Sequence, residues 1–291
     1  GLAIAEGFPF PPQLGLGAPC SYLAGGMRGD ERACRPWSSA SLSPKLHNYW
    51  IEKNNIKASY EKKLLKEEEL KKIVLEIREE KIHGINITVP FKKTVIPFLD
   101  MLTDEANKSQ SVNNIYKIKD KIIGDNTDIE GFKIALESTG QIINNKTALI
   151  LGAGGVAPSI IVALKKLKIK KIFITNRTEI KVLELKKFFP ELEIVEWGRM
   201  VDFDIIINAT SIGLNEKDEI KIDYERISRN KFFYDVIYNP EETNFLKKGK
   251  KFGAQVENGK KMFIHQAQKA FFIWHGVLPE IDTETINLLS L

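Results

Sequence analysis

Cysteine is nearly absent from this sequence of 291 residues, which contains only Cys20 and Cys34. Both lie near the start of the chain, so the remainder has no thiol for a disulfide or a cysteine-based metal site. The four histidines show no metal-ligand spacing, and we therefore predict no metal site. Scarce thiols are typical of a reducing compartment, which predicts a cytoplasmic location.

Long apolar runs are also missing. Two uncharged stretches, 7–27 and 147–164, are interrupted by glycine and proline, and the second is also short for a bilayer span. The start of the chain has no basic segment followed by an apolar helix, as a secretion signal would require. We expect a soluble, globular protein with no membrane partner.

Arginine is scarce, since the chain has 8 arginines against 35 lysines, and the formal net charge is +5. A nucleic-acid interface normally requires clustered lysine and arginine. The scattered lysines favour a solvated surface, so we predict no nucleic-acid partner. A mild positive potential is compatible with an anionic substrate or a phosphorylated cofactor.

Residues 1–37 differ from the rest in composition, because they contain seven glycines, five prolines and no lysine. Such a segment buries little apolar surface against the entropy cost of ordering it. We predict that 1–37 is disordered or foreign to the fold. The remaining length is sufficient for two domains.

The chain after residue 41 changes between helical and strand-like apolar patterns. Ser43 is predicted to cap a first helix, because Pro44 suits the position after it. Ile85, Ile87 and Val89 alternate as a strand, which points the intervening polar residues toward its opposite face. Other expected elements are a strand over 57–64, a helix over 66–81 and a hairpin over 112–123.

From residue 147 strands and helices alternate regularly. The expected order is strand 147–151, helix 155–168, strand 171–175, helix 179–189 and strands near 193–197, 204–208 and 232–236. This alternation predicts a doubly wound parallel sheet covered on both faces. Helix is expected again over 259–291.

A glycine-rich turn follows the first of these strands. Gly152 permits a tight turn, Gly154 lets a pyrophosphate approach the backbone, and the following helix offers free N–H groups to an anion. A tight turn without a ligand is the alternative, but the strand before and the helix after favour dinucleotide binding. The predicted cofactor-binding residues of the turn are Gly152, Ala153, Gly154, Gly155, Val156 and Ala157.

The end of the next strand indicates which dinucleotide binds. NAD would require an acidic residue there for its ribose hydroxyl, but the chain has Asn176, Arg177 and Thr178, with Lys181 one turn later. Cationic side chains suit a 2′-phosphate, so we predict NADP. The alternative is that Arg177 caps the sheet edge and Lys181 is solvated.

Asn208, Ala209 and Thr210 follow the apolar run 205–207. They lie at the carboxyl end of a predicted strand, where ligands bind in such sheets. We therefore add them to the cofactor site, with helix capping as the alternative for Thr210 or the following Ser211.

Lys92 and the two acids of the sequence GDNTD, Asp125 and Asp128, could carry proton chemistry. A lysine close to a carboxylate can donate and accept a proton while hydride passes between carbon centres. Taken alone, one lysine among 35 is expected on the surface, and Asp128 is typical of a helix N-cap.

Nine short motifs occur in order between residues 41 and 278. They are 41–44 (SLSP), 86–92 (NITVPFK), 111–113 (SVN), 124–128 (GDNTD), 152–157 (GAGGVA), 176–178 (NRT), 208–211 (NATS), Tyr238 with Pro240, and 259–266. In this order and spacing they resemble the shikimate dehydrogenase family.

The resemblance implies an α/β fold with two domains that face each other across a cleft. The first is an N-terminal α/β substrate domain, and the second is a Rossmann-like doubly wound NADP-binding domain, after which C-terminal helices return to the first. We place the substrate-binding catalytic domain at 38–128 plus 259–291 and the NADP-binding domain at 129–258.

The resemblance also implies roles for single residues, with Lys92 and Asp128 as the catalytic pair. The implied substrate-binding residues are Ser41, Ser43, Asn86, Thr88, Asn113, Tyr238 and Gln266, and Gly259 and Met262 join the cofactor-binding set. The implied reaction is the reversible reduction of 3-dehydroshikimate to shikimate with NADPH, on the route to aromatic amino acids. We expect a monomer or homodimer that binds only these small molecules.

Two departures from the family pattern leave alternatives open. Residues 35–40 (RPWSSA) stand where the family has a strand and turn, so we expect the first domain to lack an inner strand. Asn114 replaces the usual threonine. The alternatives are an NAD-dependent quinate/shikimate dehydrogenase, or a nucleotide-binding protein without turnover because the first strand is missing.

Overall fold

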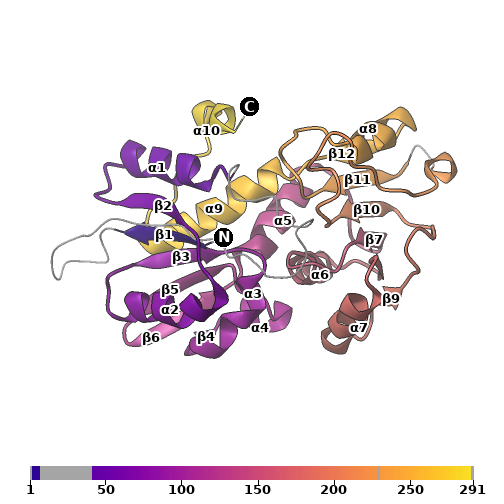
Figure 1. Ribbon diagram of the computed structural model, residues 1–291. Helices are drawn as coiled ribbons and strands as arrows, with labels where there is room; N and C mark the ends of the chain where they lie inside the picture. Colours follow the sequence, from indigo (N-terminus) through magenta and orange to yellow (C-terminus); the bar gives the residue numbers. More distant parts are fainter. Residues whose placement is uncertain (1, 7–40, 228–229, 290–291) are drawn as a thin grey trace. The chain divides into compact units, whose positions relative to one another are not determined.

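The computed structural model describes residues 2–6, 41–227 and 230–289 (Figure 1). The chain divides into two compact units. The first unit comprises Gly1–Thr127 and Gln266–Leu291, and the second comprises Asp128–His265. Each unit contains a six-stranded sheet with helices, so the predicted α/β class is confirmed. In the described residues, no helix is long and apolar enough to cross a membrane.

The first unit contains a mixed sheet of strand order β2-β1-β3-β5-β6-β4. Neighbouring strands are antiparallel except for the parallel pair of β4 and β6. The strands are β1 (Leu2–Glu6), β2 (Ser59–Lys63), β3 (Gly84–Ile87), β4 (Met101–Leu102), β5 (Asn114–Ile118) and β6 (Lys121–Asp125). The helices are α1 (Ser43–Lys53), α2 (Leu70–Arg78), α3 (Phe91–Thr94), α4 (Asp104–Ser109) and α10 (Thr283–Leu288), with α9 (Lys260–His275) entering this unit at Gln266.

One face of this sheet is aliphatic and the other is polar and aromatic. Ile85 and Ile87 of β3 belong to an apolar cluster with Ile73 and Ile77 of α2. Because side chains alternate along a strand, Asn86 points to the opposite face, as the sequence predicts. On that face Gly84 has no room for a side chain, since a Cβ would overlap the indole of Trp274.

Strand β1 corrects the prediction made for the start of the chain. Its five residues lie between β2 and β3, in register with Leu2 opposite Ile87 and Ala5 opposite Gly84. The expectations that all of 1–37 stays outside the fold, and that an inner strand is missing, are wrong for this strand. The average composition of 37 residues conceals a short apolar run, and a strand needs only backbone hydrogen bonds to its neighbours. Residues 7–37 lie outside the described part of the chain.

The start of α1 corrects a second prediction. Ser43 is the first helical residue, Leu42 occupies the N-cap position, and neither side chain caps the helix. Instead the backbone N–H of Ser43 donates to Oγ of Ser41 at 3.4 Å. The serine hydroxyl that accepts an N–H at the start of α1 is therefore that of Ser41, two residues before the predicted one.

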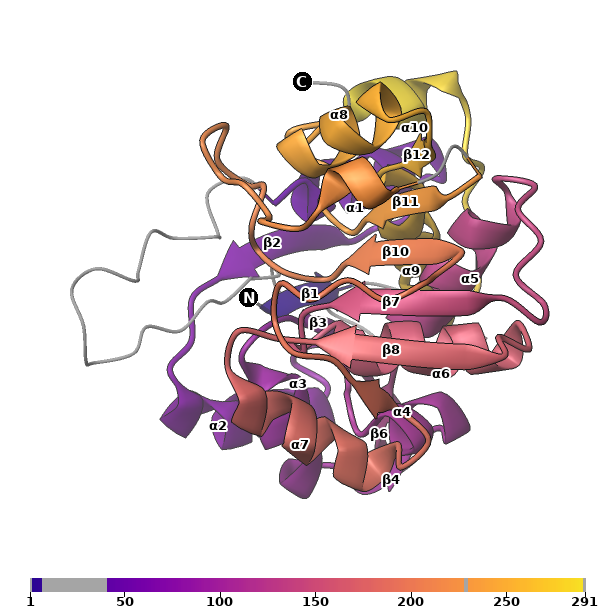
Figure 2. The same ribbon diagram turned by 90° about the vertical axis from the view of Figure 1, so that its right-hand side faces the viewer.

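The second unit contains a fully parallel sheet of order β12-β11-β10-β7-β8-β9 (Figure 2). Its strands are β7 (Thr147–Leu151), β8 (Lys171–Thr175), β9 (Glu193–Ile194), β10 (Ile205–Asn208), β11 (Phe232–Asp235) and β12 (Gln255–Glu257). Its helices are α5 (Thr127–Glu137), α6 (Ala157–Lys166), α7 (Glu179–Phe188) and α8 (Asn244–Lys251). The predicted doubly wound parallel sheet is confirmed.

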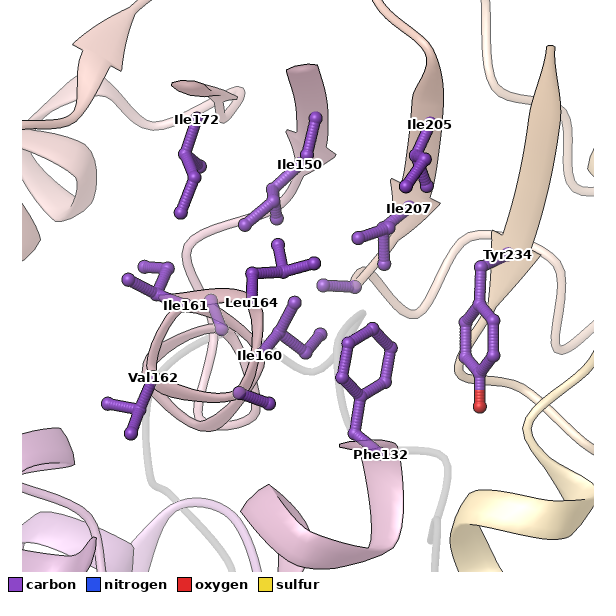
Figure 3. Packing of buried hydrophobic residues seen from close by; sticks show 14 of the residues in the cluster. Phe132, Ile150, Ile160, Ile161, Val162, Leu164, Ile172, Ile205, Ile207 and Tyr234 are labelled. Carbon is purple, nitrogen blue, oxygen red and sulfur yellow. The ribbon is translucent and has the colours of Figure 1, made fainter. Parts of the chain in front are cut away.

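Apolar residues on both faces of these strands explain the two layers of helix. On one face, residues of α5, α6 and α7 form a single cluster with the strands; Phe132, Ile160 and Leu164 surround Ile150 and Ile207 in Figure 3. On the other face, residues of α8 and of the chain between β10 and β11 form a second cluster with the alternate strand residues. Strands buried on both sides must be apolar at nearly every position, as 148–151 and 205–207 are.

Candidate functional site

Two buried asparagines form the polar centre of the first unit. The side-chain oxygen of Asn86 accepts a hydrogen bond from the hydroxyl of Tyr60 at 3.0 Å, and its amide nitrogen donates to the backbone oxygen of Asn113 at 3.2 Å. The pairing of β3 with β5 brings these residues together, because the N–H of Ile87 donates to the same Asn113 oxygen at 2.8 Å. Two of the predicted substrate-binding residues are therefore neighbours.

The side chain of Asn113 holds the start of α5. Its oxygen accepts the backbone N–H of Thr127 at 2.7 Å, and its amide nitrogen donates to the Thr127 hydroxyl at 2.9 Å. Thr127 is fully buried, and the sequence analysis did not select it. This pair of hydrogen bonds fixes Thr127, the last residue of this part of the first unit.

Lys92 is tied to the same short segment of chain. Its backbone oxygen accepts the N–H of Val112 at 2.8 Å, one residue before Asn113. The segment Val112 and Asn113 thus holds Lys92 through one backbone hydrogen bond and Thr127 through two side-chain hydrogen bonds. Lys92 is only 9% exposed and Asp128 only 8%, which is unusual for charged residues and typical of functional ones.

Asp125 and Asn126 support this turn. One carboxylate oxygen of Asp125 accepts the Thr103 hydroxyl at 2.6 Å and the N–H of Asn126 at 2.7 Å. The amide of Asn126 donates to the backbone oxygen of Ser111 at 2.8 Å. Asp125 therefore stabilises the fold at this turn. The sequence alone could not distinguish it from Asp128, the other acid of GDNTD.

The remaining predicted substrate-binding residues are distributed as follows. Ser41 and Ser43 are half-buried, and the Ser41 hydroxyl donates to that of Ser43 at 3.3 Å. Thr88 is exposed, and Gln266 is the first residue of the returning segment of the first unit. Tyr238 belongs to the second unit, where its ring stacks on Phe263 with centroids 4.6 Å apart.

The glycine turn of the second unit is shaped by its backbone. Gly152 has a φ of +107°, and its N–H donates to the backbone oxygen of Thr175 at 2.7 Å. A Cβ at this position would lie 2.8 Å from Cγ2 of Thr210, so both conformation and space require glycine. At Gly154 the nearest atom to a Cβ would be the backbone oxygen of Ala209 at 3.9 Å, an ordinary contact, so this position is not crowded.

Asn176 links this turn to the end of β8. Its side-chain oxygen accepts the N–H of Ala153 at 3.1 Å, and its amide donates to the backbone oxygen of Thr178 at 2.8 Å. Arg177 and Lys181, by contrast, have exposed side chains. Helix α6 begins at Ala157, whose N–H donates to the backbone oxygen of Gly154 at 3.1 Å, and its second residue is Pro158, which has no N–H. The positive end of the helix dipole at this point suits an anion.

A buried polar cluster lies behind the carboxyl end of the parallel sheet. Asn208 donates to Asp235 at 3.0 Å, and its own oxygen accepts the N–H of Thr210 at 3.0 Å. Asp235 also accepts the Thr243 hydroxyl at 2.7 Å. Burial raises the pKa of Asp235 to about 6. Asn208 therefore shapes the 208–211 turn from inside the protein.

Sequence reasoning missed Asp235 and Thr243. The one available signal was an acidic residue directly after the apolar run 232–234, where a solvated side chain is not expected. The two last predicted cofactor residues are also close to the protein interior. Gly259 has no room for a side chain, since a Cβ would overlap the backbone oxygen of Val236, and Met262 is buried in the apolar cluster of this unit.

The described residues contain no group of three or more side chains that could hold a metal ion. They instead provide two kinds of polar groups that could bind small molecules. The first unit has neutral amides and hydroxyls beside a buried lysine. The second has a backbone turn beside exposed cationic side chains.

Two protein families match the chain. The family described as shikimate dehydrogenase substrate binding domain matches residues 38–115, and the family described as shikimate / quinate 5-dehydrogenase matches residues 133–240. The first match falls in the first unit and the second match in the second unit.

The chain is also similar to proteins of known activity and structure. It is 67% identical over 251 residues to the shikimate dehydrogenase (NADP(+)) of Pelagibacter ubique strain HTCC1062, which covers 86% of this chain and 95% of that protein. The crystal structure of shikimate dehydrogenase from Aquifex aeolicus is 36% identical with a TM-score of 0.80, covering 87% of this chain and 94% of that one. The Thermus thermophilus enzyme, in complex with NADP(H) and shikimate, is 30% identical with a TM-score of 0.76, covering 86% and 92%.

Proposed function

The chain belongs to the shikimate dehydrogenase family, and we propose that it reduces 3-dehydroshikimate to shikimate with NADPH, reversibly, on the route to aromatic amino acids. One observation carries this proposal. Lys92 and Thr127, the residue before Asp128, are both hydrogen-bonded to the same segment, Val112 and Asn113. That attachment supports a role for Lys92 and Asp128 in one reaction.

The substrate-binding residues suit a hydroxylated carboxylic acid. Ser41, Ser43, Asn86, Thr88, Asn113 and Gln266, with Tyr238 from the second unit, remain the residues that we propose for this task. All are neutral groups that exchange hydrogen bonds with hydroxyl or carboxylate oxygens. Loss of one of these side chains is costly for substrate binding, because the substrate group that it bonds is then buried without a hydrogen-bond partner.

Lys92 is proposed to move the proton. In the reductive direction its ammonium group donates a proton to the ketone oxygen as that oxygen becomes a hydroxyl, and in the oxidative direction the neutral amine takes the proton back. Asp128, as a carboxylate, balances the charge of the ammonium form and orients it. NADPH, when bound, supplies the hydride that completes the reduction of the carbonyl carbon.

The residues of the second unit fit NADP. The glycine turn has Gly152 in a conformation that only glycine adopts freely, and a Cβ at Gly154 would meet only one atom within 4 Å. A pyrophosphate could therefore approach the backbone there, at the positive end of the α6 dipole. Arg177 and Lys181 are exposed and cationic, as a 2′-phosphate requires. We propose that the other predicted residues line the same cofactor site; they are Ala153, Gly155, Val156, Ala157, Asn176, Thr178, Asn208, Ala209, Thr210, Gly259 and Met262.

Neither alternative is favoured. The interpretation as an NAD-dependent quinate/shikimate dehydrogenase is opposed by the NADP(+)-dependent relative at 67% identity. The interpretation as a binding protein without turnover rested on a missing inner strand, a position that β1 occupies. We further propose a cytoplasmic monomer or homodimer without nucleic-acid partners. The proposed domain limits are 38–128 plus 259–291, to which the structure adds β1, and 129–258.

Replacement of Lys92 tests the proposal. In Lys92→Ala, we expect kcat for shikimate oxidation to fall by about 10² to 10⁴, the usual contribution of a general acid or base. The KM for shikimate should change only a few-fold, as followed by NADPH absorbance. The exposed neighbour provides the control, so Lys93→Ala should behave as the parent.

Two outcomes would count against this assignment. A parallel loss in kcat and in shikimate binding would move Lys92 to a binding role. A parent chain that turns over neither 3-dehydroshikimate nor shikimate with either nicotinamide cofactor would reject the function itself.

Replacement of Arg177 tests the cofactor assignment. In Arg177→Ala, we expect the preference for NADP over NAD, measured as the ratio of kcat/KM values, to fall about tenfold, because a charge-assisted hydrogen bond contributes about 1.5 kcal/mol or more. Arg199 is another exposed arginine of the second unit, and Arg199→Ala should leave the ratio unchanged. An unaltered ratio in Arg177→Ala would show that the side chain is merely solvated.

A further inference from the structure

We propose that Tyr60 is a positioning residue, which fixes the amide of Asn86 so that this amide offers the substrate an N–H group rather than an oxygen. The inference rests on the proposed function, because it assigns Asn86 to the substrate. It adds a residue that lies outside the nine motifs and that composition and spacing did not single out.

The amide direction follows from its two partners. The amide nitrogen of Asn86 faces the backbone oxygen of Asn113, which can only accept, and the amide oxygen faces the Tyr60 hydroxyl. A reversed amide would place oxygen against oxygen at Asn113. One N–H of Asn86 is used by Asn113, so the second N–H is the group that the amide can offer to a ligand.

Tyr60 is itself held rigidly. Its backbone N–H donates to the side-chain oxygen of Asn48 at 2.9 Å, and its backbone oxygen accepts from the Asn48 amide at 2.8 Å. Its ring is 1% exposed and lies flat on the ring of His47, with centroids 4.1 Å apart and planes 3° apart. Both Asn48 and His47 belong to α1, so this helix determines where the phenol hydroxyl lies.

The stacked histidine keeps this contact neutral. Burial, followed by the nearby charge of His275, lowers the pKa of His47 well below its ordinary value. The imidazole that stacks on Tyr60 is then uncharged at neutral pH, and the Tyr60 hydroxyl donates to Asn86. Helix α1 thus connects the Ser43 region to the Asn86 amide through Tyr60.

Removal of the phenol hydroxyl should therefore weaken substrate binding without affecting the proton transfer. In Tyr60→Phe the ring and its stacking on His47 are retained, but the Asn86 oxygen loses its donor and the amide can turn. A neutral hydrogen bond contributes about 1 kcal/mol, so we expect the KM for shikimate to rise about five- to tenfold. Because Asn86 transfers no proton, kcat should stay within twofold, and the KM for NADP should not change.

A matched tyrosine provides the control. Tyr234 is fully buried in β11 of the second unit, and its hydroxyl has no hydrogen-bond partner in the described structure. Tyr234→Phe removes the same atom from a similarly buried ring, so it should leave both KM values unchanged. An equal change in both variants would assign the effect to the loss of a buried hydroxyl in general.

A double-mutant cycle with Asn86→Ala distinguishes positioning from a merely structural role. If Tyr60 acts through Asn86, then Tyr60→Phe raises the shikimate KM in the parent but not further in Asn86→Ala. The inference is overturned if Tyr60→Phe leaves the shikimate KM unchanged, if it raises that KM equally in Asn86→Ala, or if it lowers kcat and raises both KM values together. Turnover by the parent enzyme is measured first, so a failure of the proposed function is seen independently of these outcomes.

Discussion

The two units hold their polar residues in different ways. In the first unit, side chains bond to one another across neighbouring elements, as in the contacts of Tyr60 with Asn86 and of Asn113 with Thr127. In the second unit, the site is mainly a backbone shape, formed by Gly152 at a φ of +107° and by the start of α6. A backbone shape is encoded by consecutive residues, whereas a side-chain network exists only after distant parts of the chain have met.

The comparison predicts different consequences of substitution. A change in the backbone-built turn should affect folding and cofactor binding together, because one conformation serves both. A change in the side-chain network should affect one ligand more than the fold. The buried cluster at Asp235 belongs to the second unit but is built from side chains, so it provides an internal test of this distinction.

The largest effect is expected for Gly152→Ala. The left-handed backbone costs an alanine about 1–2 kcal/mol, and the crowding by Thr210 adds about 1–3 kcal/mol, so the free energy of unfolding should fall by about 2–5 kcal/mol. The KM for NADP should rise at the same time. Gly154→Ala is the control, because a Cβ there would make only an ordinary contact at 3.9 Å, which predicts nearly unchanged stability even if NADP binds less well. Denaturant unfolding of both variants measures the difference, and equal stabilities would contradict the role of the turn.

Asp235→Asn should alter the pH dependence of stability. The pKa of Asp235 rises from 3.8 to about 6, so the folded protein binds this proton more tightly than the unfolded chain does. Its contribution to stability is fully present below about pH 4 and is lost as the pH rises through 6. The shift corresponds to a change on the order of 3 kcal/mol. The free energy of unfolding of the parent, minus that of the variant, should fall by most of this amount between pH 4 and pH 7.

A surface carboxylate provides the contrast for this measurement. Nζ of Lys231 lies 2.9 Å from a carboxylate oxygen of the exposed Asp202 and lowers the pKa of that carboxyl. The contribution of Asp202 to stability is therefore lost as the pH falls. Asp202→Asn should therefore give a pH dependence of opposite sign and smaller size. A flat difference curve for Asp235→Asn would mean that the buried cluster tolerates the charge without cost.

The smallest effect is expected for Asn114→Thr. Asn114 is fully buried in β5, and neither atom of its amide has a hydrogen-bond partner in the described structure. A buried unpaired polar group costs about 1–3 kcal/mol, and threonine also favours strands. We expect the variant to gain about 1 kcal/mol of stability, seen as a Tm about 2–4 °C higher. The neighbouring Asn113→Thr should instead lose stability, because it breaks both bonds to Thr127. A lower Tm for Asn114→Thr would indicate that its amide has a use that the present contacts do not reveal.

Local pattern was sufficient for most of the second unit. Strands β7 and β8 have the predicted bounds, and α6 is two residues shorter at each end than predicted. Apolar runs bounded by glycine and charged residues leave few alternatives when each strand is followed by its own helix. The first unit was less predictable, since β1 depends on pairing with β3, a distant part of the chain. The prediction for the start of α1 failed for a local reason, because Ser41 and not Ser43 accepts the hydrogen bond there.

By itself, the sequence determined the α/β class, the alternation of the parallel sheet and the motifs that place the chain in its family, because these depend on residues that are close along the chain. Only the tertiary structure revealed Tyr60, Thr127 and Asp235. Their hydrogen bonds join residues 26, 14 and 27 positions apart. A polar residue becomes part of a site when folding buries it and a hydrogen-bond partner from a distant part of the chain replaces its bound water. The residues next to it in the sequence do not predict either change.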